Sequence, residues 1–96
     1  MTTAVRLQGL TDGLVTGDPL RVFLWRAADH QARAEPLRLT SEWAEESAMA
    51  RTYRITSLVL ACYTLGIKRD TREWDEAVRW IADHCTEAAT RKRVRV

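Results

Sequence analysis

The sequence lacks an apolar segment long enough to cross a membrane. Its longest run without a charged residue, 55–67, has thirteen residues. A helix of that length spans about 20 Å of the roughly 30 Å that a hydrocarbon core requires. The first ten residues also lack the long apolar stretch and the cleavage site of a secretory signal. We therefore expect a protein without a membrane partner, located in the cytoplasm.

Residues that build reactive centres are scarce as well. The chain has two cysteines, Cys62 and Cys85, and two histidines, His30 and His84, and none of their spacings matches a metal-binding pair. Neighbouring residues on a helix point about 100° apart, so His84 and Cys85 do not share a face for nucleophilic catalysis. No phosphate-binding loop or dinucleotide fingerprint occurs. The sequence thus predicts a protein that is not an enzyme and has no metal or cofactor.

Net charge is also low. Fifteen cations and thirteen anions give +2, which is too little to predict nucleic-acid binding from the total alone. An apolar fraction of 46% with 29% charged residues is ordinary for a globular protein, and 96 residues fit one domain with a small core. We assign residues 1–90 to a single helical domain and residues 91–96, RKRVRV, to a basic C-terminal tail.

The uncharged run is typical of a buried helix. Residues 58–63 and Leu65 are apolar on all sides of a helical wheel, which predicts a central helix surrounded by others. A buried strand is the alternative, because the run contains several β-branched residues. Gly66 favours the helix, since it can adopt the left-handed conformation that ends one while Ile67 packs back on Cys62. Thr40 can cap the start, so we expect a helix over 41–65.

Capping residues predict two further helices. Asp18 and Pro19 are typical of a helix start, and an apolar stripe continues over 19–33. Asp70 and Glu73 have the spacing of a capping box, and an apolar stripe follows them as far as residue 89.

The N-terminal residues 1–17 leave two alternatives. Leucines at helical spacing favour a short helix, whereas the Asp-Gly pair at 12–13 favours a hairpin turn, and we prefer the helix. With these elements the predicted fold is all-α, a compact bundle of three or four helices with a central buried helix near residues 55–65.

Two tryptophans fall outside the apolar stripes of their predicted helices. Trp25 lies about 140° from the stripe of its helix, and Trp80 about 120°. Tryptophan and arginine are frequent anchors of protein interfaces, and an arginine adjoins each ring. The predicted partner-binding residues are Val22, Trp25, Arg26, Asp29, Arg79 and Trp80. The alternative is that each helix uses a second face against the central helix, which would bury both rings.

A nucleic-acid interface is a second candidate. Residues 55–90 imitate a helix-turn-helix corner, because Gly66 follows Cys62 by four residues and precedes a second helix. Acidic residues 73, 75 and 76 would face the phosphates and oppose binding. The cations that would contact nucleic acid come from the corner and from the basic tail: Lys68, Arg69, Arg72, Arg91, Lys92, Arg93 and Arg95.

These observations predict a small non-catalytic protein that binds another protein stoichiometrically, as an adaptor, inhibitor or regulatory subunit does. A nucleic-acid-binding regulator is the alternative. A homo-oligomer is compatible with both, because the faces outside the apolar stripes can pair with themselves.

Overall fold

Helices make up most of the chain in the computed structural model, which describes residues 1–94. Within that range the elements are α1 (Thr3–Asp12), α2 (Pro19–Ala34), a short 3-10 turn η1 (Glu35–Leu37), α3 (Ser41–Leu65) and α4 (Arg72–Val94). The all-α bundle predicted from the sequence is confirmed, and residues 1–17 contain the preferred short helix.

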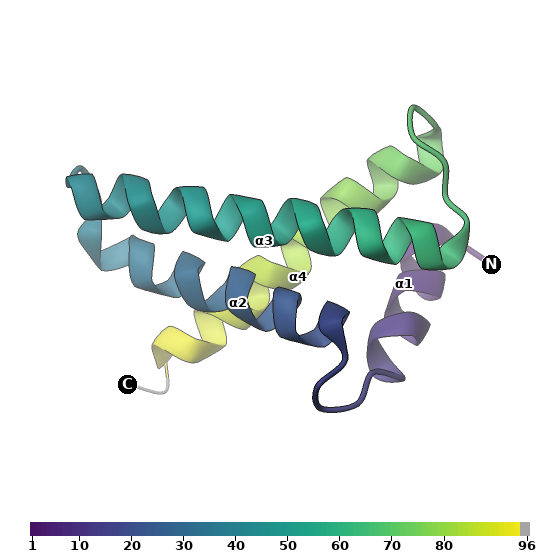
Figure 1. The fold of residues 1–96 in the computed structure, drawn as a ribbon, viewed down its shortest axis with the longest axis horizontal. Coiled ribbons are helices and arrows are strands. Elements are labelled where there is room, and N and C mark those ends of the chain that lie inside the picture. The colour runs from purple at the N-terminus through teal and green to yellow at the C-terminus, as the bar shows by residue number, and fades with distance from the viewer. Residues whose placement is uncertain (95–96) are drawn as a thin grey trace.

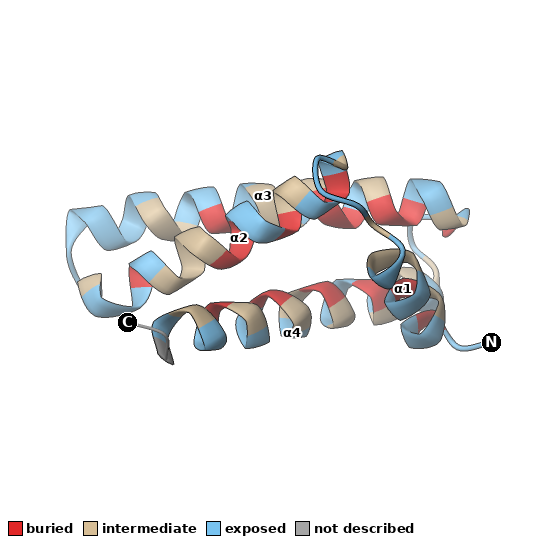
Figure 2. Cartoon of the chain, turned by 90° about the horizontal axis from the view of Figure 1, so that it is seen from below, coloured by how far each residue is buried: buried red, intermediate tan, exposed pale blue. Residues whose placement is uncertain are grey.

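The helices are arranged in two layers. Figure 1 shows α2 and α3 running antiparallel side by side, with α4 crossing behind them. Figure 2 shows the same arrangement from below, where the buried residues of α4 face the α2 and α3 layer. The short α1 packs mainly against α4, near the end of the bundle where α3 terminates. The opposite side of the α2 and α3 pair therefore has no helix over it in the described part of the chain.

Local capping explains where α3 begins and ends. Thr40 Oγ1 accepts a hydrogen bond from the Trp43 backbone N–H at 3.1 Å. At the other end Gly66 has φ 71°, and the Ile67 N–H donates to the Cys62 carbonyl at 2.9 Å, the pattern expected of a Schellman ending. The guanidinium of Arg6 also donates to the Leu65 carbonyl, which ties α1 to this terminus.

The start of α4 differs from the prediction. Thr71, and not Asp70, caps the helix, because Thr71 Oγ1 accepts from the Trp74 N–H at 3.2 Å. Asp70 has φ 60° and belongs to the turn before the cap. At its other end α4 continues as far as Val94. The predicted boundary between the domain and a basic tail at residue 91 therefore falls inside this helix.

Small side chains line much of the core. The buried apolar residues are Leu7, Leu20, Leu24, Ala27, Ala28, Ala34, Ala50, Leu58, Ala61, Cys62, Ile67, Ala77, Ile81, Cys85 and Ala89. Both cysteines are free thiols. Burial raises the pKa of Cys85 to about 11, against the opposing effect of Arg54, and burial likewise raises the pKa of Cys62. Both thiols are therefore protonated and behave as small apolar side chains at neutral pH.

The central segment of α3 is buried along one part of its circumference only. Leu58 and Ala61 are buried against the neighbouring helices, whereas Ile55, Val59 and Tyr63 are 48%, 47% and 85% exposed. The helix is thus covered by α2 and α4 rather than surrounded by other helices. An apolar residue on every side of a helical wheel does not by itself distinguish these cases, because a partner molecule can also cover the remaining side.

Two glycine-to-alanine substitutions should have opposite effects on stability. Gly66→Ala places an L-residue in the left-handed region and should lower the free energy of unfolding by about 1 kcal/mol. Gly9→Ala lies inside α1 and should raise it by about 0.5 kcal/mol, since alanine favours helix. A Cβ meets no atom within 4 Å at either site, so no steric clash contributes to either change in stability. Urea unfolding measures both, and effects of the same sign would contradict the assigned helix ending.

Candidate interaction surface

Trp25 projects from α2 as an exposed ring between two hollows. Its side chain is 57% exposed. The larger hollow, about 360 Å³, is called the Trp25 groove and is lined by Thr11, Asp12, Leu14, Arg21, Leu24, Trp25, Ala28, His84, Ala88, Arg91 and Lys92. The smaller hollow, about 240 Å³, is lined by Thr16, Gly17, Arg21, Val22 and Trp25. Trp25 and Arg21 belong to both, so the two hollows form one continuous surface around the indole.

Cations surround the indole. Lys92 Nζ from α4 lies 3.8 Å from the centroid of the Trp25 ring, a cation–π contact that fixes the ring relative to α4. Arg21 donates to the Leu14 carbonyl at 3.4 Å, which holds its guanidinium beside the groove. Asp12, the acidic residue of the lining, accepts from Gln8 at 2.7 Å. The surface therefore combines an apolar floor with a mainly positive rim.

Trp80 is half-buried and has a different environment. Its ring stacks on His84 at a centroid distance of 4.9 Å and an interplanar angle of 13°, and it packs against the core. His84 also lines the Trp25 groove. Burial lowers the pKa of His84, the Arg91 charge lowers it further, and Glu87 and Asp12 act in the opposite direction. Trp80 thus supports the wall of the groove through His84.

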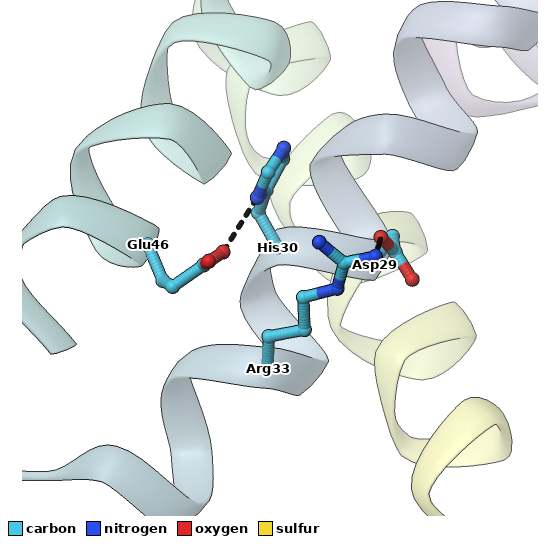
Figure 3. A network of polar contacts seen from close by, with 4 residues as sticks. All are labelled: Asp29, His30, Arg33 and Glu46. Carbon is cyan, nitrogen blue, oxygen red and sulfur yellow. Dashed lines mark hydrogen bonds and ion pairs between the residues drawn. The ribbon is translucent and has the colours of Figure 1, made fainter. Parts of the chain in front are cut away.

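A set of polar and aromatic contacts joins α2 to α3 on another side of α2. Figure 3 shows His30 and Glu46 pointing toward each other, with Nδ1 and Oε2 2.5 Å apart, and Arg33 paired with Asp29 at 3.0 Å. The Tyr53 ring stacks on His30 at 5.7 Å. The two contacts of His30 hold α2 and α3 together. The Asp29–Arg33 ion pair lies within α2 and gives Asp29 a partner on its own helix.

The predicted partner-binding residues are thus only partly brought together. Val22 and Trp25 line the same hollow. Arg26 turns toward α3, where its guanidinium lies 5.6 Å from the Tyr53 ring. Asp29 pairs with Arg33, and Arg79 is exposed but lines neither hollow. Arg21 belongs to the surface and was not predicted, although its position one helical turn before Trp25 is the sequence signal for it.

The predicted nucleic-acid contacts form two separate groups. Lys68 and Arg69 lie in the turn before α4, and Arg72 is the first residue of that helix. The Arg69 guanidinium lies 5.7 Å from the centroid of the Trp74 ring, and Arg72 pairs with Glu76 at 3.4 Å. Arg91 and Lys92 lie in the Trp25 groove, about 28 Å farther along the helix. Arg93 follows them and donates to Thr90 at 3.4 Å. Arg95 lies outside the described residues.

Within residues 1–94, no three histidine, cysteine or acidic side chains are grouped as they would be around a metal ion. The same part of the chain contains no helix with the length and apolarity needed to span a membrane. Comparison with protein families, curated proteins and solved structures finds no match to this chain.

The lowered pKa of His84 predicts a loss of stability in acid. The ordinary value is 6.5, so on acidification the unfolded chain binds a proton at this site before the native protein does. The free energy of unfolding should therefore be fully retained above about pH 6.5 and decrease as the pH falls below it. Urea unfolding of the parent and of His84→Gln at about pH 7.5 and about pH 5.5 tests this, because the variant should lose less stability between the two conditions. An equal loss in both proteins would contradict the assignment.

Proposed function

We propose that this protein is a small non-catalytic binding protein that acts by stoichiometric association with another protein, as an adaptor, inhibitor or regulatory subunit does. The observation that supports this most strongly is the exposed Trp25 ring between two adjoining hollows. Tryptophan provides a large, rigid contact area at low entropic cost, and such rings often provide much of the binding energy of an interface.

The chemistry of the surface suggests the kind of partner. The apolar floor of the Trp25 groove suits an aliphatic or aromatic side chain. Arg21, Arg91 and Lys92 around it favour carboxylates nearby, since complementary charge increases the rate of association and selects among partners. A segment that combines an apolar side chain with flanking aspartate or glutamate residues fits these properties.

A nucleic-acid-binding regulator is the second candidate. In its favour, Arg91 and Lys92 lie beside an exposed aromatic ring. Single-stranded nucleic acid is commonly bound by such a combination, in which bases stack on the ring while cations contact the phosphates. The separation of the two basic groups along α4 weakens the helix-turn-helix version of this proposal.

Trp25→Ala should weaken partner binding strongly with little effect on the fold. We expect affinity to fall by about 30-fold or more, while the free energy of unfolding changes by about 1 kcal/mol or less because mainly a surface cation–π contact is lost. The parent and the variant are immobilised, and the proteins and nucleic acids that each retains from an extract of the source cells are compared. The purified partner is then titrated against both proteins. Trp43→Ala is the matched control, since Trp43 is a 40% exposed ring on α3 that lines neither hollow.

Salt separates the two candidates. A protein held by Trp25 should stay bound at about 1 M salt, where charges are screened beyond about 3 Å. A nucleic acid should be released, because its affinity falls steeply with salt. A partner retained by Trp25→Ala and lost from Trp43→Ala would contradict the proposed surface.

A further inference from the structure

His84 places a group that changes charge near neutral pH in the wall of the Trp25 groove. Its ring stacks on Trp80 with an interplanar angle of 13°, a contact that covers a face of the imidazole and not the edge that carries its nitrogens. Within residues 1–94 no hydrogen bond occupies either of these nitrogens. A ring N–H of His84 can therefore donate to a carboxylate that enters the groove.

Charged groups from three helices face His84. They are Asp12 of α1, Arg21 of α2, and Glu87, Arg91 and Lys92 of α4. Burial and the Arg91 charge lower the pKa of His84, whereas Glu87 and Asp12 act in the opposite direction. The free protein thus holds this imidazole mostly neutral at pH 7, and one cause is a cation on the rim of the groove.

We propose that the Trp25 groove binds an acidic partner segment together with a proton, which His84 takes up on binding. This inference rests on the proposed function, because it concerns the same surface and an occupant that carries carboxylates. A carboxylate that pairs with Arg91 neutralises the charge that opposes protonation of His84, and it adds a negative charge beside the ring. Both changes favour the imidazolium, so the affinity for the segment increases as the pH falls.

Burial of His84 beneath the bound segment acts in the opposite direction, because loss of water disfavours a charged ring. The ring is already half-buried and stacked on Trp80 in the free protein, so the segment removes only the water that remains at its edge. A carboxylate within hydrogen-bond distance favours the charged form by about tenfold or more. The charge effect therefore exceeds the effect of burial.

A synthetic peptide of defined charge tests the proposal. The peptide has central leucines between pairs of glutamates, blocked ends and a fluorescent label, and its binding is measured by anisotropy. Its glutamates are ionised both at about pH 7.5 and at about pH 5.5. The dissociation constant of the parent protein should be lower at the acidic pH by about 5-fold or more.

Two variants and a second peptide assign this effect to His84. His84→Gln should bind the peptide with nearly the same dissociation constant at both pH values, because glutamine does not titrate. His30→Gln is the matched control, since His30 is the second histidine of the chain and does not line the groove, and it should keep the pH dependence of the parent. Circular dichroism at both pH values checks that each variant is folded.

The second peptide has glutamine in place of every glutamate and is titrated against the parent protein. It should bind no more tightly in acid, because it brings no carboxylate to Arg91 or His84. This comparison needs no substitution in the protein, so it tests the coupling independently of the stability of His84→Gln.

Three results would overturn the proposal. They are a parent that does not bind the glutamate peptide at up to about 1 mM, a Trp25→Ala variant that binds it as tightly as the parent, and an equal pH dependence in the parent and His84→Gln. The proposed function is tested separately at about pH 7.5, where His84 is mostly neutral, with the partner captured from cells. A captured protein that requires Trp25 and binds equally at both pH values would overturn the proton uptake and leave the proposed function in place.

Discussion

Alanine and cysteine side chains at the contacts between α2, α3 and α4 determine how closely these helices approach. Ala27 and Ala61 are almost completely buried, as are Ala77 and Cys85. Each such residue buries little area, so the domain depends on close packing over the full length of its helices rather than on a few large side chains. The arrangement brings α4 tightly onto one side of the α2 and α3 pair. The other side of α3 has no such cover, and Ile55, Val59 and Tyr63 are exposed there.

The helix ends that could be predicted from sequence are those set by local interactions. Gly66 ends α3 because its conformation and the Ile67 hydrogen bond involve only residues within one turn. Thr40 caps the same helix for the same reason. At the start of α4 two adjacent residues can both serve as caps, and the prediction of Asp70 was wrong because the turn holds that residue at φ 60°. Sequence patterns locate such a boundary only to within a residue or two.

The surfaces were harder to predict than the helices, because exposure depends on contacts between distant residues. The position of Trp25 outside the apolar stripe of α2 indicates a side chain that does not pack in the core, and the ring is exposed. Trp80 has a similar position, yet it is half-buried and stacks on His84 beside the end of α1. Nothing local links Lys92 to Trp25, since 66 intervening residues separate them. Similarly, Ile55, Val59 and Tyr63 belong to a segment with the composition of a core helix, yet they are exposed. Sequence alone does not show which side of such a helix the rest of the chain covers.

One side of α3 is sealed by the neighbouring helices and the other is open, and thiol reactivity measures this difference directly. Tyr63→Cys introduces a thiol on the open side next to Cys62, which is buried and free in the native chain. In the folded protein one thiol per chain should react rapidly with a thiol reagent. Cys62 and Cys85 should react only after unfolding, because burial limits access and raises their pKa values. Rapid reaction of Cys62 in the folded protein, at a rate similar to that of the introduced thiol, would contradict the described packing of α3.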